Sequence, residues 1–253
     1  MITIAFCLQK GGVGKTTTTL GIGIELALMG ARVLLVDIDA QGNLTQALGY
    51  DPTEIENSVY EVLLNPTRDP AFAILHSDHG VDLLPANLTL AGAEMTLINH
   101  YGRELLLRSA LGQLRDRYDY ILIDTPPSLG LLTGNALTAA DSVIVPLQAH
   151  AFALKALPQL EQVIQIVHAL NPSLSIGGIV VTMSDRRTNI NKMVEENVRA
   201  QYGDLVFTTV IPFNVSLVEA PAVGQPIAAY APGSRGAQAY HELALEVAAR
   251  YGR

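Results

Sequence analysis

Six short apolar runs without polar alternation constrain the fold of this chain most. They cover residues 2–8, 32–36, 120–123, 142–146, 176–183 and 206–211. A strand with apolar side chains at every position is buried on both faces, which is typical of a parallel sheet covered by helices. Segments of helical character alternate with these runs, at residues 17–29, 104–117, 154–169, 190–202 and 237–251. The alternation predicts βαβ units and an α/β fold, a doubly wound, mostly parallel sheet flanked by helices.

The chain is long enough for one large domain, because 253 residues can bury a substantial core. Hydrophobic residues make up 49% and charged residues 16%, a balance that excludes a disordered or fibrous protein. No run of Pro, Gly or Ser is long enough for a linker, so we predict a single domain over residues 1–253. Residues 42–80 are the least regular and are expected to form an inserted helical or loop region.

Charge and cysteine content limit the classes of partner and compartment. Sixteen Lys and Arg against 24 Asp and Glu give a net charge of −8, which argues against a surface made wholly for nucleic acid or anionic lipid but leaves room for a local basic patch. The single cysteine, Cys7, cannot close an intramolecular disulfide or supply a multi-thiolate metal site. No signal peptide is recognisable, and the apolar runs are shorter than the roughly 20 residues that span a bilayer. We expect a soluble, cytoplasmic protein.

A glycine-rich loop follows the first apolar run and precedes the first helical segment. It reads Gln9-Lys10-Gly11-Gly12-Val13-Gly14-Lys15-Thr16-Thr17 and holds two of the four lysines of the chain. Backbone N–H groups and the helix dipole favour an anion here, Lys15 can reach the β- and γ-phosphates of a nucleotide, and Thr16 offers a hydroxyl to Mg²⁺. The strict GxxxxGK[ST] pattern is not met, because Gln9 stands where its first glycine belongs. A plain strand-to-helix turn is the alternative.

Carboxylates follow two other apolar runs, and they favour a phosphate-binding loop over a plain strand-to-helix turn. Asp37 and Asp39 come after the second run, and Asp124 comes after the third. The carboxyl ends of parallel strands meet at one edge of the sheet, where ligands bind. Four hydrophobic residues followed by Asp124 match a segment whose carboxylate holds a water on Mg²⁺. A purely local turn or capping role fits Asp37 better than Asp39. The sequence therefore predicts a phosphate and metal site.

The motifs KGGVGKTT, VDIDAQGN, ILIDTPP and IPFNVSLVEAP resemble those of the ParA/Soj branch of the deviant-Walker ATPases, a group that also contains MinD and the nitrogenase iron protein. The resemblance covers nearly the whole chain. It implies a P-loop fold, ATP or ADP and Mg²⁺ as cofactors, and a weak intrinsic ATPase that forms an ATP-sandwich homodimer. It further implies that hydrolysis is stimulated by a ParB-like or other cargo-adaptor protein, for positioning a chromosome, a plasmid or another cargo.

The resemblance also assigns roles to individual residues. Lys10 would cross the dimer to touch the phosphates bound by the partner subunit, and Lys15 would act on those of its own. Asp39 would position the attacking water, Asp37 would lie near the Mg²⁺ shell, and the metal would be held by Thr16, Asp39 and Asp124. The implied nucleotide contacts are Lys10, Gly11, Gly12, Val13, Gly14, Lys15, Thr16, Thr17, Met183, Pro212 and Asn214.

By the same resemblance, a basic segment would bind DNA without sequence preference and associate the protein with the nucleoid. Its residues are Arg186, Arg187, Lys192 and Arg199. Phe213 and Ser216 occupy positions at which chromosomal members of the family often carry Arg, which leaves open a nucleotide-switched scaffold that acts on proteins without DNA. A basic terminal helix, which would indicate membrane binding, is not found: residues 240–250 hold two acids and one Arg.

Overall fold

The computed structural model describes residues 1–150, 155–185 and 187–252. These residues form a seven-stranded sheet in the order β3-β4-β2-β5-β1-β6-β7. The strands are β1 Ile2–Phe6, β2 Val33–Asp37, β3 Leu75–His76, β4 Asp82–Leu84, β5 Tyr120–Asp124, β6 Ser142–Gln148 and β7 Ile176–Thr182. Neighbouring strands are parallel except for the antiparallel edge pair β3 and β4. The predicted doubly wound, mostly parallel sheet is confirmed.

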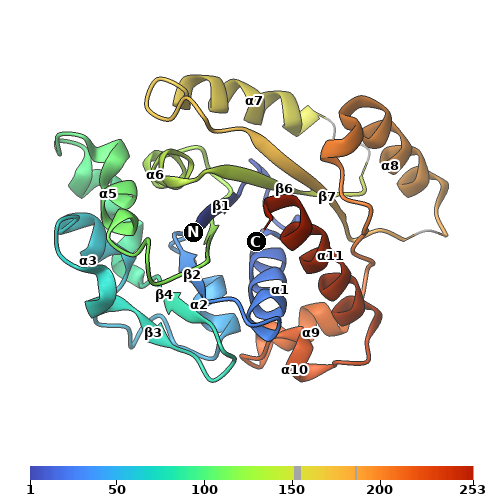
Figure 1. Ribbon diagram of the computed structural model, residues 1–253, viewed down its shortest axis with the longest axis horizontal. Coiled ribbons are helices and arrows are strands. Elements are labelled where there is room, and N and C mark those ends of the chain that lie inside the picture. Colours follow the sequence, from blue (N-terminus) through green and yellow to red (C-terminus); the bar gives the residue numbers. More distant parts are fainter. Residues whose placement is uncertain (151–154, 186, 253) are drawn as a thin grey trace.

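Helices cover both faces of this sheet (Figure 1). One layer consists of α1 Lys15–Leu28, α2 Asn43–Ala47, α9 Ser216–Ala222, α10 Ile227–Tyr230 and α11 Arg235–Tyr251. The other consists of α3 Val59–Leu64, α4 Ala93–Leu97, α5 Leu106–Gly112, α6 Leu131–Ala139, α7 Ala156–Val167 and α8 Asn189–Tyr202. Short 3-10 turns lie at Pro70–Ala73, Leu88–Gly92, Arg103–Leu105 and Gly203–Leu205. No described helix is both long and apolar enough to cross a membrane.

The burial of β1 explains why its sequence shows no polar alternation. Successive side chains of a strand point to opposite faces of the sheet. Ile4 and Phe6 pack into the core beneath α1 and α11, whereas Ala5 packs into the core beneath α5 and α6. All three are fully buried. Each face of the strand is therefore apolar because each meets a layer of helices.

Residues 206–211 do not form the predicted strand. Val206 makes only an isolated bridge to Ile179 of β7. Beyond it, the N–H groups of Thr208 and Thr209 donate at 2.7 Å to the two carboxylate oxygens of Glu246 in α11. These two N–H groups make no bond to β7, although the N–H groups of Phe207 and Ile211 on either side donate to the carbonyls of Ile179 and Val181 at 2.9 Å. The prediction of a regular strand was wrong because a contact with a distant helix interrupts the pairing with β7.

Residues 42–80 are more regular than expected. They contain α2, α3, a 3-10 turn and the edge strand β3. The capping box at α3, in which Ser58 and Glu61 satisfy each other's backbone donors, marks a helix start that was missed. The helix expected over 104–117 is shorter, with a 3-10 turn before α5. The start expected for the next helix, at residue 154, lies outside the described residues.

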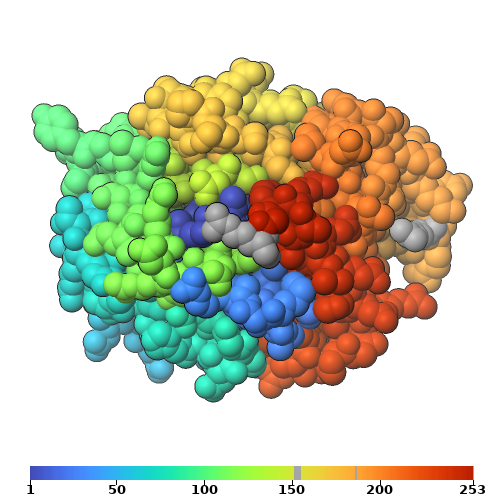
Figure 2. All heavy atoms as spheres, in the orientation of Figure 1, coloured from blue at the N-terminus to red at the C-terminus, as the bar shows by residue number. Residues whose placement is uncertain are grey.

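The C-terminal helix α11 lies directly on α1, and Figure 2 shows the two side by side on the face that carries both termini. Tyr240 of α11 is 1% exposed and fits against Gly21 of α1. Its hydroxyl lies 3.2 Å from Oγ1 of Thr18. The last helix therefore supports the helix that begins at the glycine loop.

Candidate functional site

The glycine loop connects β1 to α1 and has the backbone of an anion cradle. Gly12 and Gly14 adopt the left-handed conformation, with φ values of 69° and 89°, which glycine alone adopts without strain. The Val13 carbonyl accepts a hydrogen bond of 2.8 Å from Oγ1 of Thr182, which ties the loop to β7. A side chain at Gly11 or Gly12 would meet nothing within 4 Å, so open space lies beside the loop.

The Lys15 side chain is folded into this loop. Its ammonium donates to the carbonyl of Lys10 at 3.1 Å and to that of Leu8 at 3.4 Å. The residue is only 7% exposed, and burial lowers the pKa of its ammonium while the charge of Asp124 opposes that shift. A buried cation of this kind is stabilised when an anion enters beside it.

Asp37 and Asp124 are neighbours at the carboxyl edge, because β2 and β5 pair in parallel with these two residues in register. Both carboxyls are fully buried, and burial raises the pKa of each. Repulsion from Asp39 adds to the pKa shift at Asp37, and repulsion from Asp37 adds to the pKa shift at Asp124. Oδ1 of Asp124 is buried and has no hydrogen-bond partner among the described residues. Paired carboxylates with an unsatisfied oxygen fit a divalent cation and its bound water.

Thr16 joins this carboxylate to the loop. Its hydroxyl donates to Oδ2 of Asp124 at 2.6 Å. No cluster of three or more His, Cys, Asp or Glu side chains suited to a metal occurs in the described part of the chain. Mg²⁺ fits here in the way it is held with nucleotides, by one hydroxyl, carboxylate-bound water and phosphate oxygens.

Asp37 and Asp39 have different roles in the structure. Asp37 accepts hydrogen bonds from the N–H and the hydroxyl of Thr45, each at 2.8 Å, and from the N–H of Asp39 at 3.2 Å. It therefore fixes the start of α2. Asp39 lines the cavity above the loop, and its Oδ1 accepts the Gln41 N–H at 3.0 Å. The turn role that the sequence favoured for Asp37 is what its contacts show.

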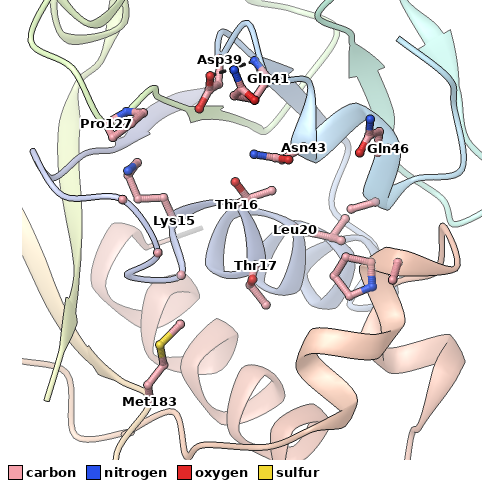
Figure 3. A pocket seen from close by; sticks show the side chains of 16 residues that line it. Lys15, Thr16, Thr17, Leu20, Asp39, Gln41, Asn43, Gln46, Pro127 and Met183 are labelled. Carbon is pink, nitrogen blue, oxygen red and sulfur yellow. Dashed lines mark hydrogen bonds between the residues drawn. The ribbon is translucent and has the colours of Figure 1, made fainter. Parts of the chain in front are cut away.

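The cavity has a volume of about 490 Å³ and contains the phosphate cradle. In Figure 3, Lys15 and Thr16 lie on its floor and Asp39 lies across from them. Several lining residues were missed by the sequence analysis: Gln41, Asn43, Gln46, Leu20, Pro127, Pro221 and Ala222. Gln41, Asn43 and Gln46 stand within seven positions after Asp39, and this closeness to a predicted site residue was the available signal.

A second cavity of about 270 Å³ adjoins the first and shares Gly14, Thr17 and Met183 with it. Pro212 and Asn214, predicted to lie against the nucleotide base, line this second cavity. Met183 has a φ of 52°, the left-handed conformation, which no other non-glycine residue adopts among those described. Strained backbone of this kind often occurs at ligand sites.

Lys10 does not line either cavity of its own chain. Its ammonium donates to Oε1 of Gln148, at the end of β6, at 3.3 Å. The structure therefore separates the two lysines of the loop: Lys15 lines the larger cavity, whereas Lys10 is held against the end of β6.

The predicted basic residues differ in their surroundings. Arg187 is exposed and forms an ion pair with Asp185, with contacts of 2.8 and 2.9 Å. Lys192 is exposed on α8. Arg199 is half-buried and donates to Glu195 and to the carbonyls of Phe207 and Thr208, so its guanidinium links α8 to the following segment. The prediction for Arg186 lies outside the described residues.

Comparisons with known proteins found a matching family model and similar chains. A family model described as an AAA domain matches residues 1–176. The sporulation initiation inhibitor protein Soj of Bacillus subtilis is 49% identical over 247 residues, which is 97% of this chain and 98% of that protein. The chromosome partitioning protein ParA of Caulobacter vibrioides is 46% identical over 250 residues, 98% of this chain and 94% of that protein.

A solved structure with the same architecture is that of cobyrinic acid a,c-diamide synthase from Mycobacterium smegmatis, with bound ADP and magnesium. It has a TM-score of 0.85 and 42% sequence identity, and the match covers 100% of this chain and 97% of that one.

Proposed function

The chain belongs to the ParA/Soj family of partition ATPases, and from that premise we propose that it is an ATP-switched dimer that binds DNA without sequence preference. ATP and Mg²⁺ bind at the glycine loop, and a cargo-bound adaptor protein of the ParB type stimulates hydrolysis. The observation that carries the proposal is the position of Lys10, which belongs to the glycine loop yet does not line the cavity of its own chain.

Hydrolysis uses the groups around the larger cavity. The loop N–H groups and Lys15 bind and orient the phosphates, and Thr16 and Asp124 hold the metal site. When bound, Mg²⁺ neutralises charge on the phosphates. Asp39 accepts a hydrogen bond from the attacking water and aligns it. Met183, Pro212 and Asn214 contact the base in the adjoining cavity. Bound ADP and magnesium in the structural relative support this assignment.

Dimerisation completes the site. Lys10 leaves Gln148 and reaches the phosphates of the partner subunit, where its charge stabilises the transferring phosphoryl group. ATP thus controls the population of dimers, and hydrolysis resets it. The dimer presents two copies of Arg187 and Lys192 to DNA, and together they form a basic surface that binds the nucleoid. This local surface is compatible with a net charge of −8 per chain.

The dimer proposal is tested by light scattering of the full chain with Mg²⁺ and ATP or ADP. The wild type should double its mass with ATP only, and Lys10→Ala should remain monomeric. Gln148→Ala is the matched control, because it removes the contact of Lys10 in the monomer and keeps the lysine; it should still dimerise. Equal dimerisation of Lys10→Ala and wild type would exclude the role of Lys10 in the partner's site.

DNA binding is tested by a mobility shift of nonspecific duplex at low salt. ATP should produce a shift that weakens steeply as salt rises, and Arg187→Ala should reduce it. Arg32→Ala is the control: Arg32 also pairs with an aspartate, Asp119, but it precedes β2 and so lies at the opposite edge of the sheet. Loss of the shift in both variants would contradict a surface at Arg187.

One observation favours a second candidate function, a nucleotide-switched scaffold that acts on proteins without DNA. Arg187 is already paired with Asp185, and Phe213 and Ser216 add no positive charge nearby. An ATP-dependent dimer that shifts no duplex at any salt concentration would establish this alternative.

A further inference from the structure

The aromatic residue Phe213 is among those that line the smaller cavity. We propose that the ring of Phe213 stacks on the nucleotide base. Phe213 then adds affinity for the base, whereas the glycine loop binds only the phosphates. The inference rests on the proposed function, because it deepens the assignment of the smaller cavity as the base site. Stacking acts on any base with a π face, so Phe213 adds affinity without selecting adenine over guanine.

The backbone holds Phe213 in place before any ligand binds. Its N–H donates to the carbonyl of Ser184 at 3.1 Å, and Pro212 forms a parallel bridge with Ser184. On the other side, Oδ1 of Asn214 accepts the N–H of Ser216 at 2.9 Å. An anchored aromatic residue has few conformations to lose when a ligand covers it, which favours binding.

The ring itself is largely uncovered. Phe213 is 64% exposed although it lines the cavity, whereas Tyr240, another aromatic residue of the lining, is 1% exposed and has a hydrogen bond to Thr18. Single exposed aromatic residues are common on protein surfaces. Phe213 differs from these because it lines a cavity that shares Gly14 and Thr17 with the cavity at the glycine loop.

The rest of the lining suits a flat apolar ligand. Met183 lies over the glycine loop, with its Cε 3.9 Å from the position of a Cβ on Gly14. Leu217 and Val218 supply further apolar surface, and Asn214 is the amide among these side chains. A nucleobase has two apolar faces and a polar edge, and this lining matches both features.

Calorimetry with ADP and with inorganic tripolyphosphate separates base binding from phosphate binding. Phe213→Ala should weaken ADP binding about tenfold, in the range found for loss of one base–aromatic stack, and leave tripolyphosphate binding unchanged. Phe213→Leu keeps an apolar side chain without the π face and should recover only part of the loss. Val215→Ala is the matched control, since Val215 is 59% exposed and lies outside both cavities.

A second readout uses the absence of tryptophan from the chain. In Phe213→Trp the introduced residue is the sole tryptophan, and ADP should shift its fluorescence while tripolyphosphate should not. Unchanged ADP affinity in Phe213→Ala, or equal weakening of both ligands, would overturn the role of Phe213 with nucleotide binding intact. Failure of the wild type to bind either ligand would overturn the proposed function as well.

Discussion

Thr16 and Asp124 are 108 residues apart in sequence, yet the hydroxyl of one donates to the carboxylate of the other at 2.6 Å. The contact joins the first residue after Lys15 to the last residue of β5. It brings two of the three predicted metal-binding residues together at one edge of the sheet, and Oδ1 of Asp124 has no partner among the described residues. The fold thus brings these two groups together before any ligand binds.

Removal of the Thr16 hydroxyl should therefore weaken metal-dependent binding selectively. In Thr16→Val we expect the affinity for Mg²⁺-ATP to fall by about 10- to 100-fold, the usual effect of losing a group that supports a metal. ATP affinity in the presence of EDTA should stay the same, because the loop and Lys15 are unchanged. Calorimetric titrations with and without Mg²⁺ measure both values. Equal losses under the two conditions would show that the hydroxyl serves the phosphates instead of the metal.

Much of this site could be predicted because each residue follows a buried strand. A parallel sheet brings its carboxyl ends together, so Asp37, Asp39 and Asp124 could be placed beside the glycine loop from the strand pattern alone. The contacts that give Asp37 and Asp39 different roles could not be predicted from the sequence. They depend on Thr45, whose N–H and hydroxyl donate to the carboxylate of Asp37.

Features that depend on distant packing were not predictable. The bond of Lys10 to Gln148 spans 138 residues and joins the glycine loop to the end of β6. Residues 206–211 have the composition of a strand, but Glu246 binds the N–H groups of Thr208 and Thr209 and interrupts the pairing with β7. Strands β3 and β4 are too short to show a pattern, with two and three residues. In each case a local signal was absent or was overridden by a partner far away in sequence.

Asp39 should control the lifetime of the ATP-bound dimer. We expect Asp39→Ala to lower the rate of ATP hydrolysis by about 10²- to 10⁴-fold, the range for loss of a group that moves or orients a proton. The dimer should then persist with ATP, as followed by light scattering over time. Asp39→Asn is the matched variant, because its amide oxygen can still accept the Gln41 N–H. If only the alanine variant is slow, the residue acts through the turn and not through the water.

The contact between Gly21 and Tyr240 should make α1 intolerant of even a methyl group. A Cβ at Gly21 would lie 2.6 Å from the ring of Tyr240, so Gly21→Ala forces the packed helices apart. We expect a loss of about 1–3 kcal/mol in the free energy of unfolding, as for other overpacked cores. Because Tyr240 also lines the smaller cavity, nucleotide affinity should fall too.

Gly134 in α6 provides the control for this prediction. A Cβ there would meet nothing within 4 Å, so Gly134→Ala should raise the free energy of unfolding by about 0.5–1 kcal/mol through helix propensity. Denaturant titrations of both variants give the two values. A Gly21→Ala variant as stable as Gly134→Ala would contradict the tight packing of α11 on α1.

Cys7, which follows β1, should report unfolding through its reactivity. Burial raises the pKa of its thiol to about 11. At pH 8 about a thousandth of such a thiol is ionised, compared with roughly a quarter of an exposed cysteine with a pKa near 8.5. In the native protein, alkylation should be slow and should accelerate about tenfold per pH unit up to pH 11. In denaturant, labelling should be fast and should level off above pH 9. Rapid labelling of the native chain at pH 8 would contradict the burial of Cys7.

The same shift makes stability depend on alkaline pH. The folded pKa of Cys7 exceeds its unfolded value, so its contribution to stability is complete below about pH 8.5 and is lost as the pH rises toward 11. The loss should reach about 3 kcal/mol, at 1.36 kcal/mol for each unit of the shift. In Cys7→Ala this component should be missing, although the variant starts from a lower stability. Parallel declines of wild type and variant between pH 8.5 and 11 would show that other groups, and not this thiol, set the alkaline limit.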